Sequence, residues 1–167
     1  ARQFDGRVLL ESFHEGADLR IVVIGFEVVA AAIRRPAQVI GDGQNSISTL
    51  IEAQSRRRQA ATNGESRIPM DAETLRTVQA AGFEYDSILP RGQTLVVRKA
   101  ANLHTGGHLE DVTHILHPVL VDAAVRAARA LDIPVVGLDL LVPAADQPEY
   151  VFIEANERVG LANHEPQ

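Results

Sequence analysis

Two carboxylates and one amide near the C-terminal end of the chain have the residue types and spacing of a cation site. The apolar run Val135–Val142 predicts a buried strand that carries Asp139. After a polar turn, the run Tyr150–Glu157 predicts its hairpin partner, which carries Glu154 and Asn156. Side chains two apart on a strand share a face, so we expect Glu154 and Asn156 to lie together, beside Asp139 across the hairpin.

An all-oxygen set of this kind suits a hard cation. Mg²⁺ binds carboxylates when substrate phosphates and water supply its remaining ligands, and Mn²⁺ is an alternative. Acidic residues near strand ends are also often solvated and hold no ligand. A plain α+β binding domain with a structural acidic hairpin is therefore one alternative explanation.

The composition limits the class of protein. A chain of 167 residues suits one compact domain or part of a larger one, and its 46% hydrophobic content argues against wholesale disorder. The net charge of -6 argues against a general nucleic-acid binder, although it allows nucleotides held with a cation. Without cysteines, neither disulfides nor thiolates contribute. The apolar runs are far shorter than a membrane span, so we expect a cytoplasmic protein with no membrane partner.

The elements that must hold the site are mixed in type. Strands Leu19–Ile24 and Glu27–Ile33 flank Gly25-Phe26, and glycine in the first turn position predicts a type II′ hairpin turn. The other expected elements are helices starting after Ser46 or Ser48, after Asp71 and at Pro118, a strand Thr94–Ala100 and a loop Asn102–Asp111. The pattern predicts an α+β fold with a mainly antiparallel sheet and flanking helices.

Three other motifs have simpler explanations. His104 and His108 lie four apart in a loop without the helix that would align their rings, which argues against a metal pair. The run 41–43 lacks the Lys-Ser/Thr of a phosphate-binding P-loop, so a tight turn is favoured. Taken alone, Asp18 and Arg20 are typical of a solvated pair on a strand edge.

Several segments resemble the ATP-grasp ligases, in the correct order and over nearly the whole chain. Glu11-Ser12-Phe13 and the following residues 16–25 resemble the hinge and hairpin of that superfamily. Pro36–Gly43 and Arg98–Gly107 resemble segments of its cyanophycin synthetase-like branch. The ordered combination is more specific than any one motif.

The last segment, Glu154–Arg158 with 160–165, resembles N-acetylglutaminylglutamine amide synthetase-like members. It departs from many of them at Val159, where they carry proline. The family's glycine-rich phosphate loop and nucleotide-binding lysines, which precede the hinge, are absent. We therefore expect residues 1–167 to be the C-terminal part of an ATP-grasp domain, a fragment of a longer chain that is inactive alone. Within it, residues 41–93 are expected to be an inserted helical and loop segment.

The resemblance implies how ATP would be held. Glu11 would accept a hydrogen bond from the adenine amino group, and the backbone of Ser12 and Phe13 would contact the ring edge. Asp18 would bond the ribose hydroxyls. The implied ligands of Mg²⁺ are Asp139, Glu154 and Asn156. The polar positions implied near the transferred phosphate and the acyl intermediate are Arg20, Arg34, Arg98 and Asn102.

The implied activity is an ADP-forming carboxylate–amine ligase that makes an amide or peptide bond through an acyl phosphate. Phosphoryl transfer needs positioning and charge neutralisation, and arginine forks and a cation supply both. The expected partners are small amino-acid or peptide substrates and further copies of the chain in a homo-oligomer. Two alternatives are a cyanophycin-type or glutathione-type synthetase with a different acceptor, and a degenerate ATP-grasp module that binds nucleotide or supports assembly without catalysis.

Overall fold

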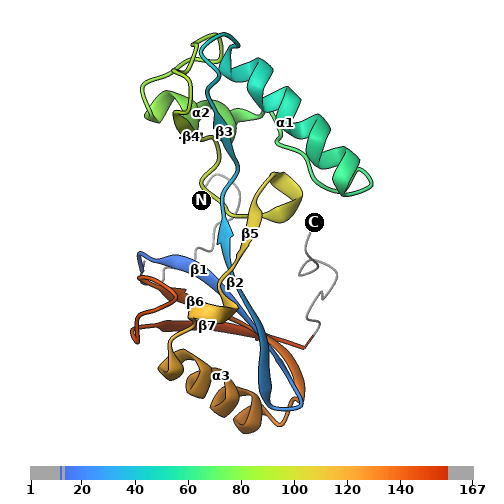
Figure 1. Ribbon diagram of the computed structural model, residues 1–167, viewed down its shortest axis with the longest axis vertical. Coiled ribbons are helices and arrows are strands. Elements are labelled where there is room, and N and C mark those ends of the chain that lie inside the picture. The colour runs from blue at the N-terminus through green and yellow to red at the C-terminus, as the bar shows by residue number, and fades with distance from the viewer. Residues whose placement is uncertain (1–11, 13, 158–167) are drawn as a thin grey trace, which may run out of the picture.

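The computed structural model describes residue 12 and residues 14–157, which form two units with separate hydrophobic cores (Figure 1). The larger unit is a five-stranded sheet in the order β5-β2-β1-β6-β7, and every neighbouring pair is antiparallel. Its strands are β1 (Ala17–Ile24), β2 (Glu27–Arg35), β5 (His108–Asp111), β6 (Val135–Val142) and β7 (Val151–Asn156). The predicted hairpin of β6 and β7 is confirmed.

Helix α3 (Pro118–Leu131) covers one face of this sheet (Figure 1). The helix begins where His117 Nδ1 accepts a hydrogen bond from the Val119 amide at 3.2 Å, and it ends at Asp132 in the left-handed conformation. Its buried side includes Leu120 and Ala124, whereas Leu131 in the last turn is 49% exposed. Alternate residues of β1 and β6 pack against the helix, which leaves the opposite sheet face for polar side chains.

The turn between β1 and β2 differs from the prediction. Gly25 and Phe26 both have positive φ, 61° and 65°, which is the signature of type I′ and not of type II′. The Arg129 guanidinium lies 4.9 Å from the centre of the Phe26 ring, which also packs against the larger core. We attribute the unusual conformation of Phe26 to this tertiary packing, which a local turn pattern does not contain.

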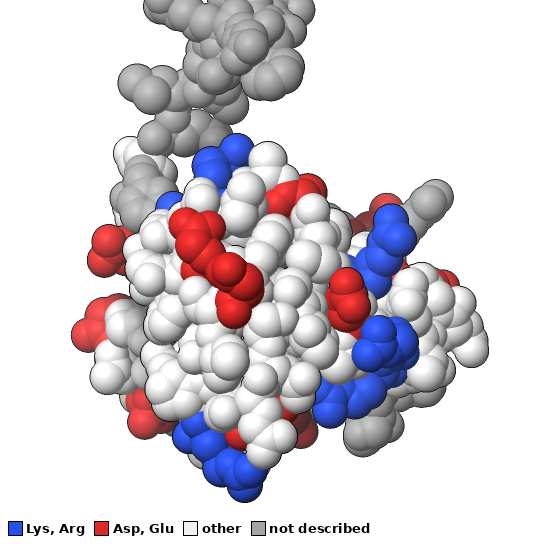
Figure 2. Space-filling model, turned by 90° about the horizontal axis from the view of Figure 1, so that it is seen from above, with Lys and Arg blue, Asp and Glu red and all other residues white. Residues whose placement is uncertain are grey.

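The smaller unit consists of two helices on a two-stranded antiparallel sheet. Its elements are β3 (Gln38–Ile40), α1 (Ile47–Ala61), α2 (Ala72–Ala80) and β4 (Thr94–Val96). The Ser46 and Asp71 side chains cap α1 and α2 as expected, and strand β4 ends earlier than the predicted Thr94–Ala100. Figure 2 looks onto this end of the molecule and shows one acidic group surrounded by uncharged surface, whereas acidic and basic side chains lie side by side near the rim.

Two chain segments join the units (Figure 1). One runs directly from β2 to β3. The other runs from β4 through a 3-10 turn, Leu103–Thr105, to β5, so the expected loop Asn102–Asp111 ends in a short edge strand. No helix among residues 14–157 has the length and apolar content needed to cross a membrane. The α+β class, with a mainly antiparallel sheet and flanking helices, is confirmed.

Candidate functional site

A polar cluster occupies the sheet face opposite α3. The strand registers place its members side by side: Arg20 pairs with Asp139, and Asp139 pairs with Glu154 on the next strand. On the other side of β1, Asp18 pairs with Arg34 of β2. The sheet thus brings together six of the predicted site residues: Asp18, Arg20, Arg34, Asp139, Glu154 and Asn156.

Asp139 is the centre of this cluster. Arg20 Nη1 lies 2.9 Å from both carboxylate oxygens of Asp139, and Arg34 Nη2 donates to Oδ1 at 3.0 Å. Arg34 also reaches Asp18 through Nη1 at 3.2 Å. Arg20 and Asp139 are only 6% and 5% exposed. Burial raises the pKa of Asp139, and the ion pairs with the two arginines oppose that shift.

Glu154 and Asn156 complete the cluster from β7. Asn156 Nδ2 donates to Glu154 Oε1 at 2.8 Å and to Asp139 Oδ2 at 3.2 Å. The hydrogen bond from Asn156, followed by that from Asp139, lowers the pKa of Glu154. The pKa values of these two neighbouring carboxyl groups therefore move in opposite directions, one because of burial and the other because of hydrogen bonds.

These three residues fit a Mg²⁺ ion by their donor chemistry. A half-turn of the Asn156 amide would replace Nδ2 with the acceptor Oδ1 and present three oxygen ligands from two rigid strands. No group of three His, Cys, Asp or Glu residues suited to a metal ion gathers anywhere in the described part of the chain, this site included. The set of Asp139, Glu154 and Asn156 contains only two carboxylates, so its third ligand would be an amide.

Gly137 is a part of the site that the sequence analysis missed. A Cβ at this position would lie 2.4 Å from Cζ of Arg20, so the guanidinium occupies the space that a side chain would fill. The glycine therefore lets Arg20 lie flat over β6 and reach Asp139. The only sequence signal is a glycine inside a strand, which often marks a close approach of other groups.

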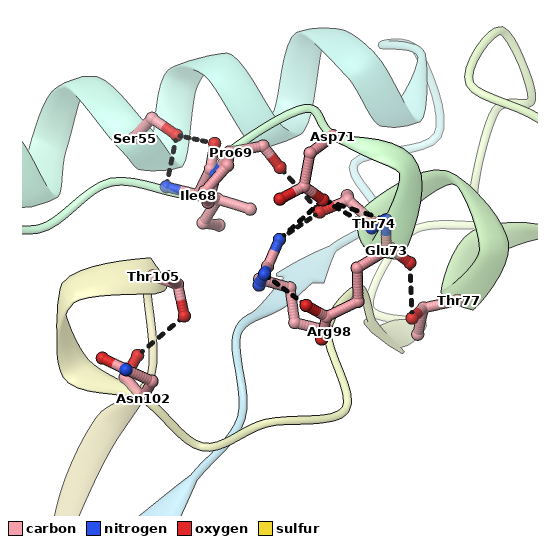
Figure 3. Close-up of polar contacts among 10 residues, drawn as sticks. All are labelled: Ser55, Ile68, Pro69, Asp71, Glu73, Thr74, Thr77, Arg98, Asn102 and Thr105. Carbon is pink, nitrogen blue, oxygen red and sulfur yellow. Dashed lines mark hydrogen bonds and ion pairs between the residues drawn. The ribbon is translucent and has the colours of Figure 1, made fainter. Parts of the chain in front are cut away.

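Arg98 and Asn102 do not join this cluster. Arg98 is 5% exposed in the smaller unit, where Nη1 donates to Asp71 Oδ1 and Thr74 Oγ1 at 2.9 Å each (Figure 3). Nη2 donates to Glu73. The Asn102 side chain accepts from the His104 amide at 2.9 Å and so caps the 3-10 turn. These contacts hold the smaller unit together, and the roles predicted for the two residues near phosphate and acyl group stay predictions.

The Arg98 network predicts a stability effect that is separate from any chemistry. We expect Arg98→Met to lower the free energy of unfolding by about 1–3 kcal/mol, because Thr74 loses a buried partner while the acids remain partly solvated. Urea unfolding measures this change. Arg76→Met on the exposed side of α2 is the control and should have little effect. Equal values for both variants would show that the Arg98 ion pairs contribute nothing.

The predicted adenine contacts cannot be placed. Glu11 and Phe13 lie outside the described residues, as does the segment 158–165 that carries part of the resemblance. Ser12 is described and exposed.

Comparison with known proteins gives clear relatives, although no family model matches the chain. A cyanophycin synthetase from Crocosphaera subtropica is 35% identical over 164 residues, which cover 94% of this chain and 19% of the relative. The bifunctional glutathione biosynthesis protein GshAB from Mannheimia succiniciproducens is 30% identical over 163 residues, which are 91% of this chain and 21% of the relative. The chain therefore spans about a fifth of the length of these relatives.

A solved structure matches the fold as well. The crystal structure of a bifunctional glutathione synthetase from Pasteurella multocida superimposes with a TM-score of 0.74 and 27% identity, over 86% of this chain and 20% of that one. The resemblance found in the sequence is thus confirmed at the level of both sequence and fold. In sequence and in fold this chain is therefore similar to ATP-grasp ligases, among them cyanophycin synthetases and bifunctional glutathione synthetases.

Proposed function

We propose that this chain is part of an ATP-dependent carboxylate–amine ligase that forms an amide or peptide bond and releases ADP. The observation that carries the proposal is the cluster of two arginines, three carboxylates and an amide on the sheet face opposite α3. Its relatives are ligases, which supports ATP-dependent amide ligation in general. The substrates, the metal and the acyl phosphate intermediate belong to the proposal.

Within the cluster, one group of residues would bind a cation and another group would bind phosphate. Asp139, Glu154 and Asn156 would hold Mg²⁺, or Mn²⁺ in its place, and the cation would neutralise charge on the ATP phosphates when bound. Arg20 and Arg34 would orient phosphate oxygens, because a planar guanidinium matches two such oxygens at once. Asp18, next to Arg34 on the same face, would accept hydrogen bonds from the ribose hydroxyls.

The reaction needs two displacement steps. A substrate carboxylate oxygen attacks the γ-phosphorus of ATP, the bond to the bridging oxygen breaks and ADP leaves. An amine nitrogen then attacks the acyl carbon, the bond to the phosphate oxygen breaks, and phosphate departs as the nitrogen loses a proton. Arg20 and Arg34 would stabilise negative charge that develops during the first step. The relatives' names support amino-acid or peptide substrates.

The ribose role of Asp18 gives a prediction for binding. We expect Asp18→Ala to raise the KM for ATP by roughly 10- to 100-fold, since a hydrogen bond to a charged group contributes about 1.5–3 kcal/mol. Steady-state kinetics with varied ATP measures the change. Glu27→Ala, an exposed acid at the start of β2, is the control. An unchanged KM for ATP in Asp18→Ala would remove the residue from the nucleotide site.

The test of the proposed function is Mg²⁺-dependent ADP release by the full-length protein with a panel of amino acids and short acylated peptides. Release that requires one carboxylate and one amine, and is lost in Asp139→Ala, is the expected result. ATP binding without release for any pair of substrates would favour the alternative of a nucleotide-binding module without catalysis.

A further inference from the structure

The C-terminal end of helix α1 is tied to the loop that follows β4 by a buried polar network. Arg58 Nε donates to Ser66 Oγ at 3.0 Å, and Arg58 Nη2 donates to the carbonyl oxygen of Gly107. The Ser66 hydroxyl in turn donates to the carbonyl oxygen of Leu103. Ser66 is only 4% exposed. One guanidinium therefore connects the end of α1 and the segment just after it with a loop 49 residues further along the chain.

Further contacts align the same loop, residues 102–107, with the segment that follows α1. The Arg67 amide donates to the His104 carbonyl at 3.1 Å, and His104 Nδ1 lies 3.3 Å from the Glu65 carbonyl. A Cβ on Gly106 would lie 2.4 Å from Cγ1 of Ile68, so the Ile68 side chain packs directly against the backbone of Gly106. Ile68 is itself held to α1 by two hydrogen bonds with Ser55, at 3.1 and 3.3 Å (Figure 3).

The loop 102–107 lies between the smaller unit and the sheet. Gly107 is followed by β5, in which His108 pairs with Arg35 and the next residue pairs with Arg34 of the polar cluster. A Cβ on Gly107 would lie 2.9 Å from the carbonyl oxygen of Arg35, so the loop and β2 are tightly packed at this point. Only one other chain segment, between β2 and β3, joins the units within the described residues.

We propose that Arg58 is a positioning residue, which fixes the loop 102–107 against β2 at the edge of the sheet and so sets where Asn102 lies relative to the acyl group. The role of Asn102 in this inference rests on the proposed function. The statement that Arg58 holds the loop in place rests on the contacts of Arg58 alone. Nothing in the predicted roles of the site residues involves Arg58, which approaches the loop from the far end of α1.

The geometry explains why arginine is needed. Its fork donates to Ser66 and to Gly107 from different nitrogens, and a lysine ammonium at the same position cannot match both directions with the same fixed geometry. Removing the guanidinium would leave the Gly107 carbonyl without this donor and free the loop from α1. Contacts that orient metal ligands typically cost about 10- to 100-fold in activity when they are lost, and we expect a loss near the lower end of that range for this loop contact.

The helix offers a matched control. Arg57 is the neighbouring residue on α1, is exposed, and takes no part in the hydrogen bonds that Arg58 makes to Ser66 and Gly107. Replacing either arginine by alanine changes charge and helix propensity by the same amount. Arg58→Lys tests the need for the fork, and Ser66→Ala removes one hydroxyl from the network while leaving the guanidinium in place.

The experiment is amide hydrogen exchange of residues 102–107 together with steady-state kinetics on the full-length protein. For Arg58→Ala we expect exchange of the loop to rise by roughly tenfold or more, because its protection depends on local opening. We also expect the KM for the carboxylate or amine substrate to rise by about tenfold or more, because a small misplacement of the loop weakens orientation, while the KM for ATP stays within about twofold. Arg58→Lys should recover part of both effects, and Arg57→Ala should match the wild type.

Unchanged loop exchange in Arg58→Ala would overturn the proposal. So would raised exchange with unchanged kinetics for the carboxylate and amine substrates, or an equal change in every kinetic constant, which a general loss of structure would produce. If Arg58→Ala does not fold, Ser66→Ala decides: it should raise loop exchange in the same direction by a smaller factor, and wild-type exchange would count against the network. A wild-type protein that releases no ADP with any substrate would refute the proposed function, whereas loop exchange would still show whether Arg58 holds the loop.

Discussion

Glu154→Gln should reduce ADP release by about 100-fold or more, because it removes one carboxylate charge from the proposed cation site at the point where phosphate charge must be neutralised. The side chain is exposed, and its hydrogen bond from Asn156 can be accepted by the amide oxygen of glutamine. The fold should therefore survive. The same variant should bind Mn²⁺ more weakly than the wild type when titrated in the presence of ATP.

The control for this prediction is Glu149→Gln, which changes the same charge just before β7, on an exposed residue outside the polar cluster. It should leave both ADP release and Mn²⁺ binding unchanged. Normal turnover in Glu154→Gln would remove Glu154 from the metal site. Equal losses in both variants would point to the overall charge of the hairpin and away from a specific ligand.

The sheet side of the site was predictable from the sequence because strand geometry leaves few choices. Once the two apolar runs pair as a hairpin across the turn between them, Asp139 and Glu154 become neighbours on adjacent strands. The alternation of side chains along β7 then places Asn156 on the same face. The structure also has a shift in register between Asp139 and Leu140. This irregularity lies toward the turn of the hairpin and therefore away from Asn156. The alternation of side chains along β1 likewise places Arg20 on the opposite sheet face from its two neighbours in the strand, which belong to the core.

Other features depend on contacts that no local pattern contains. The sequence places Arg98 near the end of a strand, but whether its guanidinium faces a ligand or the cap of α2 is decided by how α2 packs against β4. The hairpin turn is another case, because Phe26 takes a left-handed conformation while its ring packs in the tertiary structure. Strand β5 is only four residues long, and its pairing with β2 needs the whole smaller unit to bring it into place.

The position of Asp139 links stability to function in this site. A buried carboxylate that contacts two guanidinium groups is held in one orientation, and burial raises its pKa while the arginines oppose that change. Such a buried pair contributes little net stability compared with apolar residues, but breaking it by removing one partner is costly. We infer that the arrangement serves to orient the carboxylate, and that anything which displaces Arg20 will disturb both the fold and the proposed ligand.

Gly137→Ala should therefore be strongly destabilising for so small a change, lowering the free energy of unfolding by about 2–4 kcal/mol. The new Cβ would lie 2.4 Å from Arg20 Cζ and 2.6 Å from Nε, so the guanidinium must leave its place over the strand. Asp139 would then keep only Arg34 as an ionic partner. Urea unfolding measures the loss, and ADP release should fall in parallel because the carboxylate loses its fixed orientation.

A double-mutant cycle separates displacement of Arg20 from any effect of alanine on the strand itself. In an Arg20→Ala background the space over residue 137 is empty, so adding Gly137→Ala should cost little and could even stabilise, since alanine restricts the unfolded chain more than glycine does. The two changes should thus be far from additive. If Gly137→Ala costs the same in both backgrounds, its effect comes from the backbone of β6, and the glycine has no role in seating Arg20 against Asp139.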